Sequence, residues 1–242
     1  MIKNRKIFSV INQKGGSGKT HTSALIAMAL ATKGKTLCID ADPQAGLTSF
    51  MLHEVSANRL GLFDLLTGNK KIEDAIIKIK RHKLEFDFIG SDYRLDAIAS
   101  NLDPYALQRK FKGVKGYDYL VFDSPPTVQG ISRAIAMFSD YIVVPADISK
   151  ATIEPTLYTL RSLKEIKKKG NVVLLGYKDP GDEPKGFAAK VTREFLEKIN
   201  SNFAGSIQRG VAVQKAVYEA DMIWTEKKIY SLLKPILDIL GE

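Results

Sequence analysis

The stretch VINQKGGSGKT, residues 10–20, decides how the rest of the chain is interpreted. It ends in Gly18, Lys19 and Thr20, which match the last positions of the phosphate-loop pattern G-x-x-x-x-G-K-[ST]. That pattern begins with a glycine, and this chain has Gln13 there, followed at once by a second lysine, Lys14. A loop that binds one nucleotide needs one lysine, so the second lysine requires its own explanation.

Length and composition indicate one sizeable domain. The chain has 242 residues and is 45% hydrophobic, enough for a single α/β domain over residues 1–242. Its one cysteine, Cys38, lies in an apolar run, which excludes a disulfide framework or a cysteine-based metal site within one chain and favours a buried, inert thiol. The apolar run before the glycines is too short for a signal sequence or a membrane span. We therefore expect a cytoplasmic protein.

The charge balance is basic. Lysine and arginine number 36 against 27 aspartate and glutamate, a formal net charge of +9. Polyanions are plausible partners of such a surface, although charge alone also fits a protein that is merely soluble.

Strand-like apolar runs alternate with amphipathic helical stretches along the chain. The expected strands are residues 6–11, 36–40, 85–89, 119–123, 141–145, 171–176 and 203–207. The expected helices are residues 19–33, 131–139, 152–169, 185–200 and 226–240. This alternation predicts a mainly parallel, twisted sheet with helices on both faces. The stretch 178–186, rich in proline and glycine, is expected to be an exposed loop.

The glycine-rich loop follows a predicted strand and opens a predicted helix. Gly15, Gly16 and Gly18 would let the backbone curl and point its N–H groups at phosphate oxygens, with the helix dipole adding attraction. Lys19 would reach the β- and γ-phosphates, and the Thr20 hydroxyl would ligate Mg²⁺. A glycine-rich turn without function is the less favoured alternative.

Carboxylates follow two of the predicted strands. Asp40 and Asp42 lie in DADPQ at the end of the second strand, and Asp123 ends the strand YLVFD. Ligands of open α/β sheets bind at this edge, so Asp123 is placed to hold Mg²⁺, through water in our interpretation. A single aspartate at a strand end would more often be a turn former.

Together, KGGSGKT, DADPQ and FDSPP resemble the deviant Walker A, A′ and Walker B motifs of the ParA/MinD family of ATPases. The resemblance covers nearly the whole chain and implies the P-loop NTPase fold with ATP and Mg²⁺ as ligands. It implies that Lys14 crosses the interface of an ATP-dependent homodimer to touch the nucleotide of the other subunit. It also implies catalytic roles for Lys14, Lys19 and Asp42, with Asp42 orienting or deprotonating the attacking water, and metal support from Thr20, Asp40 and Asp123. The implied nucleotide contacts are Lys14, Gly15, Gly16, Ser17, Gly18, Lys19, Thr20 and His21. His21 departs from the small hydroxyl residue common at its position, and we expect it to be tolerated there without a role in catalysis.

Within this family, the DNA-partition branch fits best. ParA-like members bind double-stranded DNA without sequence preference when dimerised by ATP, and a ParB-like partner stimulates hydrolysis, so the resemblance implies a cytoplasmic, nucleoid-associated protein. The first expected strand begins at residue 6, so no N-terminal helix-turn-helix domain is expected. The candidate DNA contacts are Lys185, Lys190, Arg193, Arg209, Lys215, Lys227 and Lys228. A second candidate set is Arg161, Lys164, Lys167, Lys168 and Lys169. Either set could instead be an ordinary solvated helix face.

Two other functions stay open. The first is a MinD-like ATPase that positions division sites or cargo on a membrane, which would use residues 226–240 as an anchor. Asp238 and Pro235 argue against that anchor, so no membrane is expected. The second is a metabolic ATPase or amidotransferase subunit with the same loop. Nitrogenase-type iron proteins are excluded, because each subunit there supplies two cluster cysteines.

Overall fold

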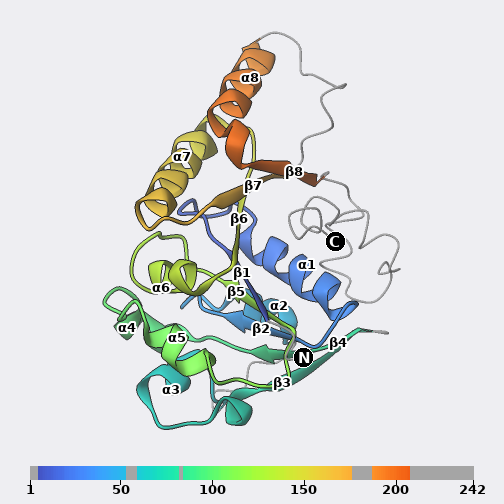
Figure 1. Ribbon diagram of the computed structural model, residues 1–242, viewed down its shortest axis with the longest axis vertical. Helices are drawn as coiled ribbons and strands as arrows, with labels where there is room; N and C mark the ends of the chain where they lie inside the picture. Colours follow the sequence, from blue (N-terminus) through green and yellow to red (C-terminus); the bar gives the residue numbers. More distant parts are fainter. Residues whose placement is uncertain (1–4, 53–58, 82–83, 176–186, 208–242) are drawn as a thin grey trace.

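One twisted sheet of eight strands organises the protein (Figure 1). The structure is a computed structural model, and it describes residues 5–52, 59–81, 84–175 and 187–207. The strand order is β3-β4-β2-β5-β1-β6-β7-β8, parallel throughout except for the antiparallel pair β3 and β4. The strands are β1 (Lys6–Val10), β2 (Thr36–Asp40), β3 (Ile77–Arg81), β4 (Leu84–Ile89), β5 (Tyr119–Asp123), β6 (Tyr141–Ala146), β7 (Gly170–Leu175) and β8 (Phe203–Ile207). The predicted mainly parallel α/β fold is confirmed.

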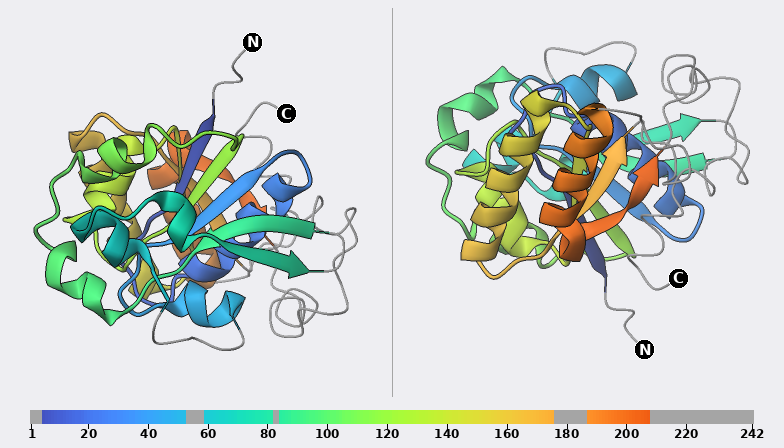
Figure 2. Two further views of the ribbon diagram at one scale, coloured as in Figure 1. Left: turned by 90° about the horizontal axis from the view of Figure 1, so that it is seen from below. Right: turned by 90° about the horizontal axis from the view of Figure 1, so that it is seen from above.

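Helices connect the strands and cover both faces of the sheet. The α-helices are α1 (Lys19–Ala31), α2 (Gly46–Met51), α3 (Leu62–Thr67), α4 (Asp96–Ala99), α5 (Ala106–Phe111), α6 (Ile131–Phe138), α7 (Lys150–Glu165) and α8 (Phe187–Ile199). Short 3-10 helices are η1 (Ile72–Ala75), η2 (Tyr93–Leu95) and η4 (Asn200–Asn202). Helix α1 lies on one side of the sheet, whereas α6 and α7 lie on the other (Figure 1). Two further views show α7 and α8 side by side at the end of the sheet formed by β7 and β8 (Figure 2).

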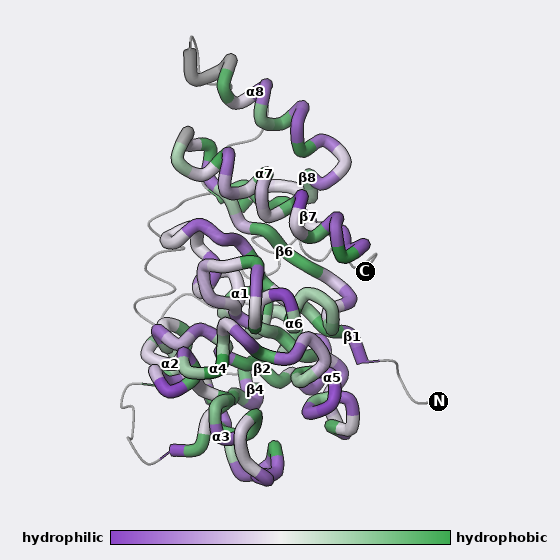
Figure 3. Tube along the Cα trace, turned by 90° about the vertical axis from the view of Figure 1, so that its left-hand side faces the viewer, coloured by the Kyte–Doolittle hydropathy of each residue, from purple (hydrophilic) through white to green (hydrophobic). Residues whose placement is uncertain are grey.

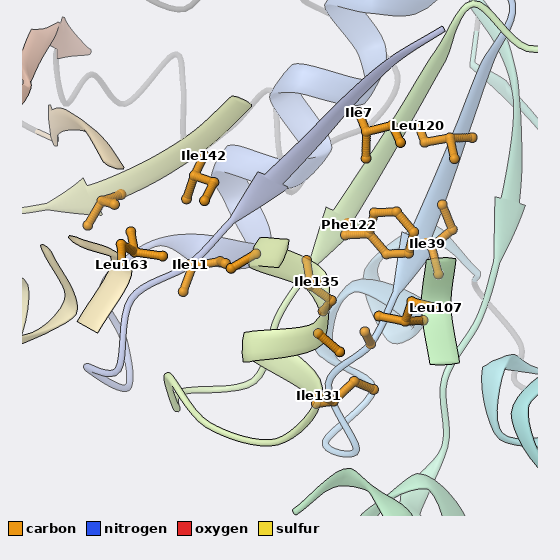
Figure 4. Packing of buried hydrophobic residues seen from close by; sticks show 14 of the residues in the cluster. Ile7, Ile11, Ile39, Leu107, Leu120, Phe122, Ile131, Ile135, Ile142 and Leu163 are labelled. Atoms are coloured by element: carbon orange, nitrogen blue, oxygen red, sulfur yellow. The ribbon is translucent and has the colours of Figure 1, made fainter. Parts of the chain in front are cut away.

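Two apolar layers flank the sheet because successive strand residues point to opposite faces. Ile39 and Phe122 pack with α5 and α6 in one layer, where Figure 4 shows them beside Leu107 and Ile135. In the other layer, α1 packs against residues such as Phe8 of β1. Strand β6 is hydrophobic along most of its length (Figure 3), as expected for a strand covered on both faces. Burying one such side chain stabilises the folded state by roughly 1.5–3 kcal/mol. Because many side chains are buried in the two layers, the sheet is held together and the ends of its strands stay in fixed register.

Helix α7 differs from its predicted bounds at both ends. The chain leaves helical geometry after Glu165 because Lys167 adopts the left-handed conformation, with φ of 57°. The backbone N–H of Lys168 then donates to the carbonyl of Leu163, which closes the helix as in a Schellman turn. The helix begins at Lys150 rather than at residue 152.

Strand β3 and the short helices α2 to α5 were not predicted. Each has six residues or fewer, too few for a periodic signal to stand out. Strand β3 reads IKIKR and is an edge strand, with the ammonium groups of Lys78 and Lys80 lying 3.7 and 3.6 Å from the Glu85 carboxylate. Its lysines face solvent, as is common on edge strands.

Two predicted segments lie outside the described residues, namely the helix 226–240 and the loop 178–186. Cys38 is fully buried as predicted, and burial raises the pKa of its thiol well above the usual value. No helix in the described part of the chain has the length and apolar character needed to cross a bilayer.

Candidate phosphate-binding site

The glycine-rich loop runs from the end of β1 to the start of α1, as predicted. Gly16 and Gly18 have φ of 71° and 87°, a left-handed geometry that residues with a Cβ rarely adopt. A Cβ added to Gly18 would lie 2.3 Å from Cδ1 of Leu175, whereas nothing lies within 4 Å of a Cβ added to Gly15 or Gly16. The loop is therefore closed towards β7 and open on the side of Gly15 and Gly16.

Lys19 is buried beneath this loop. Only 6% of its surface is exposed, and Nζ donates a hydrogen bond to the Lys14 carbonyl at 3.0 Å. Burial lowers its pKa, and the charges of Asp123 and Asp42 oppose that shift. The ammonium thus lies inside the loop's curve, where a phosphate group would be.

Two aspartates meet at the adjacent edge of the sheet. Asp40 and Asp123 occupy paired positions on β2 and β5, and both side chains are fully buried. Burial raises the pKa of each carboxyl, and the neighbouring charge of Asp40 raises that of Asp123 further. Two adjacent carboxylates away from water are costly unless a cation or protons compensate them.

The two carboxylates differ in how fully they are satisfied. Asp40 accepts hydrogen bonds from the backbone N–H groups of Asp42 and Thr48, at 3.0 and 2.8 Å, and from the Thr48 hydroxyl at 2.7 Å. Asp123 accepts one from the Ser23 hydroxyl at 2.8 Å through Oδ1, while its buried Oδ2 has no hydrogen-bond partner among the described residues. Asp123 is therefore the carboxylate with an oxygen available for a ligand, and Asp40 anchors the following loop.

The residues present fit a magnesium-bound nucleotide. Besides Asp123 Oδ2, the buried Ser17 hydroxyl also has no hydrogen-bond partner within the described ranges. Thr20, the expected metal ligand, is half-buried, and its hydroxyl interacts with Asp123. Mg²⁺ takes oxygen ligands, commonly one or two protein oxygens together with phosphate oxygens and water. Thr20 and Asp123 would hold it, with Asp40 as neighbour.

Asp42 lies in the loop after β2 and is half-buried. Its Oδ1 accepts a hydrogen bond from the Gln44 backbone N–H at 2.9 Å, and its other oxygen makes no hydrogen bond within the described residues. The predicted water-orienting carboxylate is thus held at one oxygen and available at the other.

His21 is exposed on α1 beside Phe50, with ring centroids 6.3 Å apart. Partial desolvation lowers the pKa of its imidazole. That His21 has no role in catalysis stays a prediction.

The first half of the loop is bound to a different part of the protein. The Lys14 backbone N–H donates to Oδ1 of Asn12 at 3.0 Å, and the Gln13 N–H donates to the Thr159 hydroxyl of α7 at 3.2 Å. The Lys14 side chain is half-exposed, and within the described part of the chain its ammonium has no hydrogen bond or ion pair. The two lysine side chains of this loop therefore have different surroundings. Lys14 is available for a partner outside the described residues, whereas Lys19 is buried.

The basic residues proposed for DNA contact fall into two groups. Arg193 is exposed on α8, whereas Lys185, Arg209, Lys215, Lys227 and Lys228 and the side chain of Lys190 lie outside the described residues. In the second set, Arg161 and Lys164 are exposed on α7, and Lys167 and Lys169 are exposed in the turn that follows it. Lys168 is different, because its ammonium donates to the Ser139 carbonyl at 2.7 Å and so supports the fold.

Several residues of the site carried no clear signal in the sequence. Ser23, Thr48, Asn12 and Thr159 fix the predicted groups, yet the chain separates Ser23 from Asp123 by 100 positions and Gln13 from Thr159 by 146. The only available signal was the threonine spacing at 152, 156 and 159, which places hydroxyls on one face of α7.

A pocket of about 370 Å³ adjoins the site. Thr48, Ser91, Tyr93 and Arg94 are among its lining residues, and the Thr48 hydroxyl accepts a hydrogen bond from the Ser91 backbone N–H at 2.8 Å. Thr48 therefore connects this pocket with Asp40.

Comparison with known proteins agrees with this geometry. The family described as AAA domain matches residues 5–175. Chromosome partitioning protein ParA of Caulobacter vibrioides is 26% identical over 227 residues, 87% of this chain and 83% of that protein. Maintenance of carboxysome distribution protein A of Gloeothece citriformis is 29% identical over 170 residues, 68% of this chain and 66% of that protein.

A solved structure shares the fold. The plasmid partition protein of Borrelia burgdorferi B31, determined with AMPPNP bound, superposes with a TM-score of 0.81 at 20% identity, covering 97% of this chain and 99% of that one. The phosphate loop, the paired strand-end aspartates and the matched family agree, and the chain belongs to the ParA/MinD family of P-loop ATPases.

Proposed function

We propose that this protein is an ATP hydrolase that partitions DNA, forming an ATP-dependent homodimer that binds double-stranded DNA without sequence preference and is released on hydrolysis. A ParB-like centromere-binding protein would stimulate that hydrolysis. The observation that carries the proposal is the second lysine: the Lys14 ammonium has no partner within the described residues, while Lys19 of the same loop is buried. An amine of this kind suits contact with a nucleotide held by another subunit.

The proposed chemistry is attack of water on the γ-phosphate. Mg²⁺, when bound with ATP, offsets charge on the phosphate oxygens. Lys19 would donate to those oxygens from inside the loop, and Lys14 of the partner subunit would add a second positive charge as the bond to the β-phosphate loosens. Asp42 would orient the attacking water through its available oxygen.

Exposed basic residues on two adjacent helices support DNA binding. Arg161 and Lys164 lie on the last part of α7, Lys167 and Lys169 lie in the turn that follows it, and Arg193 lies on neighbouring α8. Contacts of this kind are electrostatic, and each lysine or arginine that neutralises a phosphate steepens the fall of affinity with salt. The double variant Lys164→Glu, Lys167→Glu should weaken DNA binding uniformly across sequences and reduce the slope of log affinity against log salt by about one for each lost contact.

Co-sedimentation tests the proposed function against its alternatives. The protein is mixed with random duplex DNA or with anionic liposomes, each in the presence of ADP, ATP or a slowly hydrolysed ATP analogue. Binding to DNA that requires the triphosphate supports DNA partition. Binding to liposomes alone would instead support the MinD-like positioning function, and binding to neither would favour a metabolic ATPase or a cargo other than DNA. The carboxysome-distribution relative makes non-DNA cargo the second candidate.

A further inference from the structure

Three threonines give α7 a polar buried face. Thr152, Thr156 and Thr159 are 2%, 0% and 0% exposed, because they lie on the side of the helix that packs on the protein. A buried helix face is normally apolar, because each buried hydroxyl needs a hydrogen-bond partner. The partners of two of these hydroxyls lie at the start of the phosphate loop.

Asn12 is the centre of this network. Its Nδ2 donates to the Pro145 carbonyl of β6 at 2.8 Å and to the Thr156 hydroxyl at 3.1 Å, and its Oδ1 accepts from the Lys14 N–H at 3.0 Å. The Thr159 hydroxyl accepts from the Gln13 N–H at 3.2 Å and donates to the Pro155 carbonyl at 2.9 Å. Asn12 is itself fully buried, so water does not compete for these bonds.

Two consecutive backbone donors are therefore committed to side chains. The N–H groups of Gln13 and Lys14 bind Thr159 and Asn12, so they do not point to phosphate. The loop divides at Lys14: residues before it are held by α7 and β6, and residues after it form the open glycine turn. This tether fixes the direction in which the Lys14 side chain leaves the backbone.

The hydroxyls are themselves held rigidly. Leu157 and Leu163 of α7 belong to the apolar core, which fixes the helix on the sheet. A threonine side chain in a helix has few χ1 rotamers, so the Thr159 oxygen has little freedom to move.

We propose that Thr159, acting with Asn12, is a positioning residue for Lys14, which it aims toward the partner subunit's nucleotide. This inference rests on the proposed ATP-dependent dimer, and it adds which residues of the chain orient Lys14 for dimerisation. Thr159 contacts the Gln13 backbone, not the nucleotide, so its loss affects dimerisation more than nucleotide binding.

The test separates these two quantities with matched variants. Thr159→Val keeps the shape and removes the hydroxyl, Thr159→Ser keeps the hydroxyl, and Thr152→Val is a control whose hydroxyl pairs with Ser149 at 3.0 Å. Sedimentation over a protein concentration series with Mg²⁺ and a slowly hydrolysed ATP analogue gives the dimer Kd, and fluorescent ADP gives the nucleotide affinity. Loss of one hydrogen bond predicts that Thr159→Val raises the dimer Kd roughly 3- to 10-fold. ADP affinity should stay within about twofold, with Thr159→Ser and Thr152→Val near wild type.

Other results overturn the inference. If Thr159→Val weakens ADP binding as much as it weakens dimerisation, Thr159 holds the whole loop and does not position Lys14 in particular. Equal effects of Thr159→Val and Thr152→Val would mean general loosening of α7. If Thr159→Val does not fold, Thr159→Cys carries the same test, since a thiol is a weak hydrogen-bond partner.

The wild-type chain distinguishes this inference from the proposed function. A wild type that stays monomeric with the analogue overturns both. A wild type whose dimer needs Lys14 but tolerates Thr159→Val overturns the positioning role alone.

Discussion

Replacing Thr48 by valine tests the link between Asp40 and the loop that follows it. The Thr48 hydroxyl donates to Asp40 at 2.7 Å and accepts from the Ser91 N–H at 2.8 Å, and Thr48 is only 3% exposed. Valine has nearly the same shape, so the change removes both bonds without opening a cavity.

The magnitude follows from those two bonds. A hydrogen bond to a charged group contributes about 1.5–3 kcal/mol, and an unpaired buried N–H costs about 1–3 kcal/mol. The new methyl group returns part of this, about 0.8 kcal/mol. The expected net loss in the free energy of unfolding is roughly 2–5 kcal/mol, and the corresponding fall in Tm is roughly 4–20 °C for a chain of this length.

Thermal and urea unfolding without nucleotide measure this loss. Thr48→Ser is the matched control, because it keeps the hydroxyl and loses a methyl group, for an expected loss of about 1 kcal/mol. A Thr48→Val protein as stable as Thr48→Ser, or more stable, would refute the reasoning, since the hydroxyl would then contribute nothing.

Three further changes have definite expected outcomes. Asp42→Ala should lower ATP turnover by roughly 10²- to 10⁴-fold while nucleotide binding, measured by titration, stays near wild type; normal turnover would remove Asp42 from the reaction. Gly18→Ala should destabilise the protein by about 1–3 kcal/mol because φ is 87°, whereas Gly15→Ala, with open space around it, should unfold near the wild-type temperature. Arg94 hydrogen bonds lower the pKa of Asp92, so this pair stabilises the fold above the usual aspartate pKa of about 3.9 and the contribution is lost as the pH falls below it. Arg94→Gln should therefore be about 1 kcal/mol less stable than wild type at pH 6, with a smaller difference at pH 3.5; a constant difference across this range would contradict the assignment.

The features that the sequence predicted best are those set by residues close together along the chain. The phosphate loop, Asp40 and Asp123 were located because each follows a strand, and strands of a parallel sheet end at a common edge. Strand β3 was missed because five residues of an edge hairpin give little periodic signal.

The supporting hydrogen bonds could not be predicted in the same way. Asn12 meets Thr156 across 144 positions, and that meeting depends on β6 lying next to β1 and on the angle at which α7 crosses the sheet. Neither quantity is encoded in a local pattern. Thr48 is nearer to Asp40 in the chain, but the geometry of the turn between them, with Ala45 in a left-handed conformation, was not apparent from composition.

The mass of the protein in solution tests the central claim most directly. Light scattering after size exclusion, with Mg²⁺ and a slowly hydrolysed ATP analogue, should give the 26.8 kDa wild-type chain twice that mass, and ADP should give the mass of one chain. Lys14→Ala should bind the analogue yet remain a single chain. A wild-type protein that stays monomeric with the analogue, or a Lys14→Ala protein that dimerises as wild type does, would contradict the account.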